Sequence, residues 1–442
     1  MKNLLMLFGL TILFMEPLQS EFLKVDQIKT IKKGFKQSRI GGINIINSNG
    51  NIDVEGWDLD SVDIVVNMKI AADNESELET LFQQLMPVIE KNGENIRITT
   101  QRKTIKKTIF FGIFQESIYY SYDLFIHVPT GLAIRAENRY GNTRILNTES
   151  LIKAENYNGA MHIVRSLETE IHNKYGDTEV RDVKGALTLD NYDGKVNVSD
   201  AQGETRLNNR YGDIEASDIN GPLYVKNYDG NVRLVSILKG AEVYLKYSDL
   251  SITSATGDMR IENYSGDNTL EGITGNITLD NKYGSVTVNK VDGSLQISNY
   301  NDDIRVENVN GNLKIDCKYG SIYASRISQE VVADNYSGEI RLTKIGGSIT
   351  ANNRYGDIRI VEAPPLIRSL VYNGDIYADK IGGGTASIHL ESSYGDVKLA
   401  FEAPVSAAGN FEVQYGKVTL HGGMDWKLMK SNDKTLNSPP EQ

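Results

Sequence analysis

The sequence lacks any means of forming an intramolecular disulfide, because Cys317 is its one cysteine among 442 residues. Proline is also scarce, at 9 residues. The net charge of −11 argues against nucleic acid and anionic membranes as main partners, since both would repel an acidic chain. Glycine and tyrosine are abundant instead, at 40 and 23 residues. This composition predicts short strands joined by tight turns.

The first 20 residues are typical of a secretory signal peptide. Lys2 supplies a positive charge, and the apolar run from Leu4 to Met15 is shorter than the ~20 residues that a spanning helix needs. Pro17 and Ser20 mark a cleavage zone whose position the sequence does not fix. No cysteine follows the run, which argues against a lipoprotein anchor. We therefore expect export to the periplasm, the cell surface or the extracellular space, with no transmembrane segment in the mature chain.

An internal repeat is the dominant feature of the sequence from about residue 138 onward. Aligning the words Asn-Tyr-x-Gly and Asn-Arg/Lys-Tyr-Gly gives a period of 18 residues, and Asn138 and Asn156 extend it upstream with a one-residue slip. Leu245, Cys317 and Val371 replace asparagine in this column. Stacked amides could hydrogen-bond along the repeat axis and satisfy buried turn groups, so we interpret the column as a structural ladder. Its asparagines are Asn173, Asn191, Asn209, Asn227, Asn263, Asn281, Asn299, Asn335 and Asn353.

Five further columns of the repeat are apolar, at five, seven, ten, fourteen and sixteen residues after the asparagine. Apolar residues two apart on a strand point to one face, so each coil has two short strands that can hide that face only by stacking on neighbouring coils. The sequence thus predicts an all-β fold, a single-stranded parallel β-helix (β-solenoid) of about 18-residue coils over residues 131–421. We favour right-handed winding, which the sequence itself does not determine.

Two kinds of turn alternate along the repeat, because the residue after the ladder asparagine is a cation in one coil and a tyrosine in the next. In-register stacking would place each such tyrosine between two cations, in cation–π geometry. A stable corner is one interpretation of this strip. A binding surface for sugar rings or other envelope polymers is the other. The strip comprises Tyr192, Arg210, Tyr228, Lys246, Tyr264, Lys282, Tyr300, Lys318, Tyr336, Arg354 and Tyr372.

The two ends of the chain do not follow the period. Residues 21–130 are expected to form a mixed α/β cap over the open end of the solenoid, with one isolated coil at 43–54 and a helix at about 74–91. The apolar patch Ile109–Phe114 is interpreted as a buried hairpin or as a docking loop. Residues 422–442 are expected to be a disordered tail.

Little in the sequence indicates catalysis, a metal or a cofactor. The five histidines show no metal-ligand or triad spacing, and the acidic residues that follow the turn glycines occur about once per coil, a pattern that suits turn formation. Cys317 has no histidine nearby and is expected to be a partly buried, inert thiol. We therefore expect no catalytic, cofactor-binding or metal-binding residues.

Three features resemble the bacterial putative-adhesin family of β-strand-repeat envelope proteins, whose domain has no assigned function. They are the segment Asn-Gly-Asn-Ile-Asp-Val-Glu-Gly-Trp-Asp at 49–58, the strand Tyr-Asp-Leu-Phe-Ile-His-Val-Pro-Thr-Gly at 122–131, and the Asn/Tyr-Gly repeats. The resemblance implies an exported parallel β-helix and supplies no catalytic residues. A glycan or an envelope protein is the expected partner of such a non-enzymatic adhesin. A polysaccharide-acting β-helix enzyme and an envelope-stress sensor or regulatory partner are the alternatives, and the oligomeric state stays open.

Overall fold

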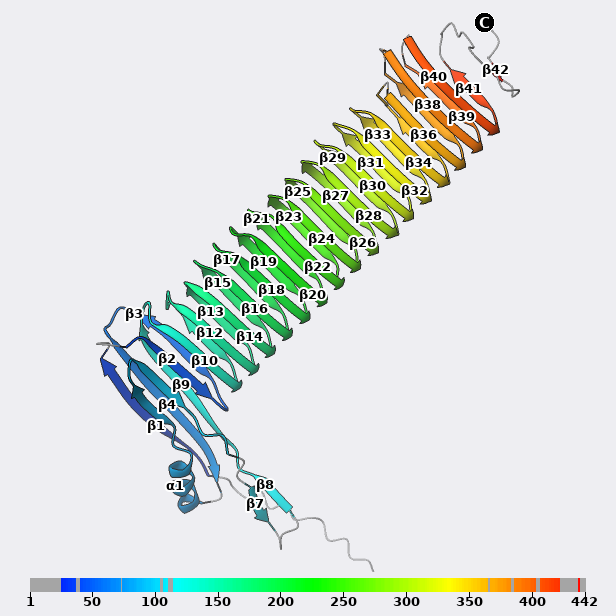
Figure 1. Cartoon of the computed structure of the whole chain (residues 1–442). Helices are drawn as coiled ribbons and strands as arrows, with labels where there is room; N and C mark the ends of the chain where they lie inside the picture. The colour runs from blue at the N-terminus through cyan, green and yellow to red at the C-terminus, as the bar shows by residue number, and fades with distance from the viewer. Residues whose placement is uncertain are drawn as a thin grey trace, which may run out of the picture.

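A computed structural model describes residues 25–36, 40–72, 74–103, 106–109, 114–364, 366–382, 385–402, 406–421 and 436–437. Its main body is a straight parallel β-solenoid of about 15 coils, with the N-terminal strands and the helix α1 at one end (Figure 1). This confirms the predicted fold class. The predicted signal peptide lies outside the described residues.

Each coil contributes one strand to each of two long parallel sheets, which we call the even sheet and the odd sheet after their strand numbers. The even sheet contains β10 (Ala133–Tyr140), β12 (Leu151–Asn158), β14 (Glu168–Tyr175), β16 (Leu187–Asp193), β18 (Thr205–Tyr211), β20 (Leu223–Asp229), β22 (Ala241–Tyr247), β24 (Met259–Ser265), β26 (Ile277–Tyr283), β28 (Leu295–Asn301), β30 (Leu313–Tyr319), β32 (Val331–Ser337), β34 (Ile349–Tyr355), β36 (Leu366–Asn373), β38 (Thr385–Tyr394) and β40 (Ser406–Tyr415).

The odd sheet alternates with it along the chain. It contains β11 (Thr143–Leu146), β13 (Met161–Ser166), β15 (Thr178–Val183), β17 (Val196–Ala201), β19 (Ile214–Ile219), β21 (Val232–Ile237), β23 (Leu250–Thr256), β25 (Asn268–Thr274), β27 (Val286–Asp292), β29 (Ile304–Val309), β31 (Ile322–Ile327), β33 (Ile340–Ile345), β35 (Ile358–Val361), β37 (Ile376–Ile381), β39 (Val397–Phe401) and β41 (Val418–His421).

The register between coils follows the 18-residue period, so equivalent side chains stack in rows. Asn191 lies beside Asn209, for example, and Val196 beside Ile214. The apolar columns point inward and form one continuous core between the two sheets. The exceptions Thr178 and Asn268 are also buried, and each accepts a hydrogen bond from the ladder asparagine of its own coil. A polar group in the core is tolerated here because it has a partner.

The C-terminal end of each odd strand uses a left-handed backbone conformation in coil after coil, just before the chain turns to the even sheet. Residues nine positions after the ladder column have φ between +51° and +60°, although most are not glycine, and Gly272 holds the same place with φ +69°. Left-handed backbone costs an L-residue roughly 1–2 kcal/mol. The non-glycine members of this column are Asn147, Arg165, Asp182, Asp200, Asp218, Ser236, Ser254, Lys290, Asn308, Arg326, Lys344, Glu362 and Lys380.

The predicted isolated coil at 43–54 is the first rung of the solenoid. Its strands β2 (Gly42–Asn47) and β3 (Ile52–Trp57) pair in parallel with β10 and β11. The chain leaves this rung to build the N-terminal end and then returns to it. The coil is therefore separated from the repeat in sequence but not in space.

The N-terminal segment extends both sheets beyond this first rung. In the odd sheet, β9 (Tyr120–Pro129) pairs in parallel with β3, and β4 (Ser61–Ala72) and β1 (Val25–Lys36) follow as antiparallel strands. In the even sheet, β6 (Asn95–Thr99) pairs in parallel with β2 and antiparallel with β5 (Val88–Asn92). The two motifs that carry the family resemblance therefore lie side by side, and the Trp57 ring stacks on His127 with centroids 4.9 Å apart.

Helix α1 (Glu75–Gln84) packs its apolar side against β4 and β1. Asn74 caps it by accepting a hydrogen bond from Glu77 N, as an N-cap asparagine does. The helix ends earlier than the predicted 91, because Pro87 follows and residues 88–92 form strand β5. Ile89, predicted on the helix, is buried in that strand.

The remaining terminal predictions have mixed outcomes. Strands β7 (Lys106–Ile109) and β8 (Phe114–Ser117) form an antiparallel hairpin, and the apolar residues 110–113 between them lie outside the described residues. Toward the C-terminus the register lengthens, so that Tyr394 pairs with Tyr415. Strand β42 (Leu436–Asn437) lies in parallel beside β41, within the range predicted to be disordered. The rest of that range is outside the described residues.

A tyrosine and cation ladder as the candidate functional site

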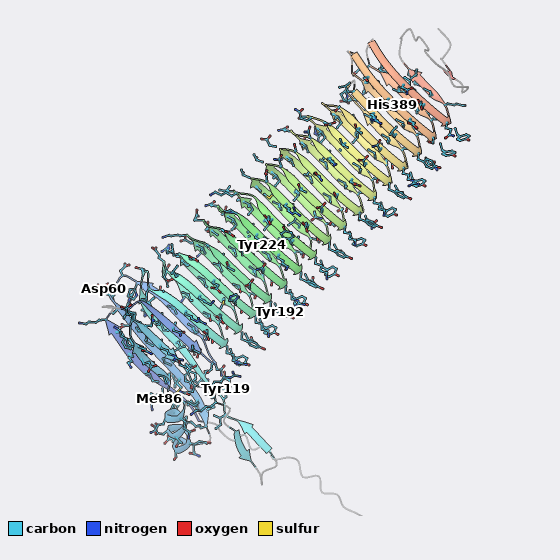
Figure 2. All side chains as sticks on the ribbon, viewed as in Figure 1. Asp60, Met86, Tyr119, Tyr192, Tyr224 and His389 are labelled. Atoms are coloured by element: carbon cyan, nitrogen blue, oxygen red, sulfur yellow. The ribbon has the colours of Figure 1, made fainter. Side chains whose placement is uncertain are left out.

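A row of tyrosines runs the length of the solenoid along the corner where each even strand turns toward the next odd strand. Tyr192 marks this corner in Figure 2, and similar rings repeat along the same edge. Consecutive rings are edge-to-face, with centroids 5.4–6.2 Å apart and interplanar angles of 70–87°, except the last pair, Tyr394 and Tyr415, which stacks at 5.0 Å. We call this row the tyrosine ladder. It comprises Tyr140, Tyr157, Tyr175, Tyr192, Tyr211, Tyr228, Tyr247, Tyr264, Tyr283, Tyr300, Tyr319, Tyr336, Tyr355, Tyr372, Tyr394 and Tyr415.

More than half of these rings come from a sequence column that the sequence-based strip left out. The strip contains Tyr192 and Tyr228, one residue after the asparagine, whereas Tyr211, two residues after its asparagine, lies between them. Two large rings in one column would be only about 4.8 Å apart. Alternating the columns allows the wider edge-to-face spacing that aromatic pairs prefer. The strict alternation of tyrosine between the two columns was the signal for this arrangement.

The cations of the strip lie among the rings of this ladder. Lys246 Nζ is 4.5 Å from the Tyr228 centroid in the preceding coil and 5.1 Å from the Tyr247 centroid next in sequence. Lys282, Lys318 and Arg354 repeat this arrangement. The predicted position of a tyrosine between two strip cations holds at Tyr228, where Arg210 also approaches to 5.7 Å. For Tyr264, Tyr300 and Tyr336, the contact comes from the cation of the following coil.

The ladder is half open to solvent and electrostatically coupled. Tyr264 is 42% exposed and Tyr300 39%. A hydrogen bond from Lys246 Nζ to the Tyr228 hydroxyl, 3.2 Å long, raises the pKa of Lys246, because it favours the protonated amine. A hydrogen bond and the positive charge of Arg139 lower the pKa of Tyr140. The corner therefore presents phenol edges and positive charges together.

The asparagine ladder supports this corner from inside. Asn209 Nδ2 donates to Gly194 O in the preceding coil and to Gly212 O in its own, both at 3.0 Å, and Asn353 and Asn227 bond in the same way. These amides thus donate hydrogen bonds to carbonyl groups of the turns. Bonding from amide to amide is not the rule, since the bond from Asn191 to Asn209 is the one of that kind among the described ladder residues. The amide hydrogens bond to carbonyl groups of the turns instead of to the neighbouring asparagine side chains.

The acidic residues that follow the turn glycines also have a structural partner. Asp213 Oδ1 accepts a hydrogen bond of 2.8 Å from the backbone N–H of Asn231 in the next coil, and Asp177, Asp249 and Asp357 bond likewise. These carboxylates are ordered by the backbone, and Asp177, Asp213 and Asp249 recur every second coil. This agrees with the turn-forming role that their spacing predicted.

Comparison with known proteins identifies the fold around this corner. Residues 43–245 match the family model described as Toastrack DUF4097. This part of the chain is therefore similar to a Toastrack domain. The match confirms the resemblance to a family of repeat domains with no assigned function. The strands continue beyond the matched residues in the same register, to β41.

Two further comparisons add little to this match. A crystal structure of a putative cell adhesion protein from Clostridium sporogenes ATCC 15579 is similar at 10% identity and a TM-score of 0.21. The likeness covers 58% of this chain and 100% of that one. At that score it carries no argument about function. No curated protein matches the chain.

Shallow grooves run along the even sheet beside the tyrosine ladder, in and next to the segment that matches the Toastrack domain. One, of about 860 Å³, is bounded by Tyr157, Lys174 and Tyr192. The next, of about 1150 Å³, is bounded by Tyr228 and Lys246 and extends past the domain to Lys282. The ladder thus forms one wall of each of these two grooves.

Other candidate chemistry in the described residues is limited. Cys317 is fully buried in the ladder column, and desolvation raises the pKa of its thiol to about 12. The thiol is therefore protonated and inert at neutral pH, as expected, although more deeply buried than predicted. No group of three or more His, Cys, Asp or Glu residues in the described ranges could hold a metal ion. No described helix is long and apolar enough to cross a membrane.

Proposed function

We propose that this protein is an exported, non-enzymatic adhesion protein that binds an extended glycan or protein partner along its tyrosine ladder. The observation that carries the proposal is the continuity of the ladder. One straight corner presents half-exposed tyrosine rings and cations along the coils, beside open grooves of about 860 and 1150 Å³. A regular linear surface suits a partner that is itself extended and repetitive, since each added coil adds an equivalent contact.

The rest of the surface supports a binding role over catalysis. Enzymes that act on polysaccharides need carboxylates free to exchange protons or to attack the sugar. The regular acidic column instead accepts backbone hydrogen bonds, as Asp213 does from Asn231 N. The predicted signal peptide at 1–20 supports export, and it leaves the periplasm, the cell surface and the extracellular space open as destinations. We also propose that residues 21–130 act as the cap of the repeat surface, although the first rung lies within that range.

Substitution of ring residues in the two grooves tests the proposal. Tyr192→Ala combined with Tyr228→Ala should weaken binding on a glycan array or in a pulldown while the fold survives, because each ring borders one groove. Tyr323→Ala with Tyr377→Ala is the matched control, since these two tyrosines lie on the odd sheet. Undiminished binding by a folded Tyr192/Tyr228 variant would reject the ladder as the contact surface. Cell fractionation of the intact protein tests export separately.

A further inference from the structure

The cations of the ladder form a straight row with a regular spacing. One cation occurs in every second coil, so neighbouring charges are about 9.6 Å apart, which is two strand spacings. The spacing is maintained because the register between coils is parallel and in step from β10 to β36. The row contains Arg139, Lys174, Arg210, Lys246, Lys282, Lys318 and Arg354.

These cations differ from most others on the surface because they have no carboxylate partner among the described residues. Elsewhere on the solenoid, cations pair with acids: Lys195 lies 3.0 Å from Glu215, Lys290 3.0 Å from Glu271, and Arg326 2.7 Å from Glu307. In the row, the amines and guanidinium groups contact tyrosine rings instead. A chain with a net charge of −11 therefore keeps one line of positive charge without acidic partners.

The residues next to the row differ between its N-terminal and C-terminal halves. In the coils between the cations, the residue after the strip tyrosine is Asp193 or Asp229 in the N-terminal half. In the C-terminal half this place is taken by neutral residues, which are Ser265, Asn301, Ser337 and Asn373. Acids remain beside the row in this half, since Glu262 and Asp280 border the same groove as Lys246 and Lys282. The neutral residues at the place of Asp193 and Asp229 remove one acid per pair of coils from the row between Lys246 and Arg354.

We infer that this row binds a linear acidic polysaccharide with one anionic group per disaccharide. The inference rests on the proposed function and names the chemistry of its partner. A spacing of about 9.6 Å is close to the length of two linked pyranose rings, so each cation of an extended chain could meet one anion. The phenol hydroxyls beside each cation can donate to sugar oxygens. The acidic remainder of the surface would repel a polyanion that is not aligned with the row.

Other polyanions fit the row less well. A nucleic-acid strand carries a phosphate about every 3.4 Å in a duplex, so most of its charges would lie between the cations. An anionic membrane would favour aromatic rings free to enter the interface. The ladder rings from Tyr140 to Tyr394 are instead packed edge-to-face. An acidic glycan is the partner that matches both the positive charge of the row and the spacing of its cations.

The test is binding to immobilised hyaluronan, a probe with one carboxylate per disaccharide, compared with its uncharged carboxyl-reduced form. We expect the intact protein to prefer hyaluronan at least tenfold, with an affinity that falls as salt is added. The variant Lys246→Gln, Lys282→Gln, Lys318→Gln should bind at least tenfold more weakly, and the Lys→Arg triple variant should retain binding. The control Lys195→Gln, Lys290→Gln, Lys344→Gln makes the same change in net charge at paired sites and should bind as the parent does.

The outcomes separate the ligand class from the proposed function. Equal loss in both Gln triple variants would overturn the row as the site, because net charge alone would then explain binding. Equal binding of the charged and uncharged glycans overturns the acidic ligand but leaves the adhesion proposal, provided that the Tyr192/Tyr228 variant fails to bind. Binding to anionic phospholipid vesicles without hyaluronan binding overturns the inference in favour of a membrane. A row variant with unchanged melting temperature and unchanged affinity also overturns it.

Discussion

Lys246 Nζ lies 4.5 Å from the Tyr228 ring centroid and 3.2 Å from its hydroxyl oxygen, in a contact between two adjacent coils. The lysine therefore contacts the ring and the hydroxyl of one tyrosine together. The same relationship recurs at Lys318 and Tyr300, where the Nζ-to-oxygen distance is 3.5 Å. A cation held in this way is ordered without being neutralised, which leaves its charge available to a ligand.

Removing the Tyr228 hydroxyl should lower the pKa of Lys246. The hydrogen bond to that oxygen favours the protonated amine, so Tyr228→Phe should move the pKa back toward the ordinary value of lysine. A raised pKa means that the interaction stabilises the fold below the ordinary lysine pKa, and that this stabilisation is lost as pH rises through the raised value. Heteronuclear NMR titration of the lysine Nζ resonances measures the shift. An unchanged titration in Tyr228→Phe contradicts the assigned cause.

Adding one methyl group at the ladder corner should strongly destabilise the solenoid. Gly212 has φ +119°, and a Cβ there would collide with the carbonyl oxygen of Gly194 in the preceding coil. We expect Gly212→Ala to cost about 3 kcal/mol or more in chemical denaturation. Gly93→Ala is the control, because Gly93 has φ +61° with open space around its Cβ position. It should cost only about 1–2 kcal/mol. Equal costs would mean that coil contact contributes nothing.

Glycine should stabilise the opposite corner. Ser236 has φ +57°, a conformation that glycine adopts without the steric penalty of a side chain. We expect Ser236→Gly to raise the free energy of unfolding by about 0.5–1 kcal/mol, measured by urea denaturation. The same substitution at Ser251, within strand β23, should lower it by about the same amount. A loss of stability at both sites would contradict the assignment of strain to the turn.

The amide of the asparagine ladder should matter more than that of its neighbour in sequence. Asn353 Nδ2 donates to Gly338 O and Gly356 O inside the corner, whereas Asn352 makes an amide bond to Asp334 on the outer face. Asn353→Ala leaves two turn carbonyls without this donor and should cost about 2–3 kcal/mol. Asn352→Ala should cost about 1 kcal/mol or less. Thermal unfolding of the pair measures the difference, and the reverse order would show that the inner amides are dispensable.

Cys317 should report unfolding by its reactivity. Burial raises the pKa of its thiol to about 12, so very little thiolate forms at pH 8 in the folded chain. We expect a disulfide reagent to label the native protein very slowly and the protein in guanidinium chloride within the mixing time of a manual assay. Because the raised pKa belongs to the folded state, stability should fall as pH rises from the ordinary thiol pKa toward 12. Rapid labelling of native protein would contradict the burial.

The sequence predicts the fold well wherever a periodic constraint acts on every coil. Stacking places residues 18 apart in one buried row, as it does Val196 and Ile214. Both residues are therefore apolar, and the sequence shows the row as an apolar column. The N-terminal segment lacks this 18-residue periodicity, so its sequence gives no comparable prediction. Helix α1 is shorter than predicted because Ile89 falls at helical spacing by chance, while Pro87 and the pairing of β5 with β6 decide the local structure. Nothing local in the sequence shows that β3 pairs with β9.

The candidate site is predicted only in part for a related reason. The strip follows a single column, but the geometry of a turn brings two columns to one corner, so Tyr211 joins Tyr192 and Tyr228. Side-chain size favours this arrangement, since rings in one column are forced into a closer stack, as Tyr394 and Tyr415 are at 5.0 Å. For the asparagines, the sequence predicts bonds to turn groups in general, but it does not show that the carbonyls of Gly194 and Gly212 are the acceptors.

Because cation-bearing coils alternate with coils that lack the cation, the smallest repeating unit of the corner is a pair of coils. Excising one coil of 18 residues, from Asn263 to Asp280, would join two cation-bearing coils and bring Lys246 beside Lys282. Excising two consecutive coils would restore the original sequence of corners. Gene duplication and loss in such a chain should therefore proceed by coil pairs, so that homologous rods differ in length by whole multiples of that larger unit.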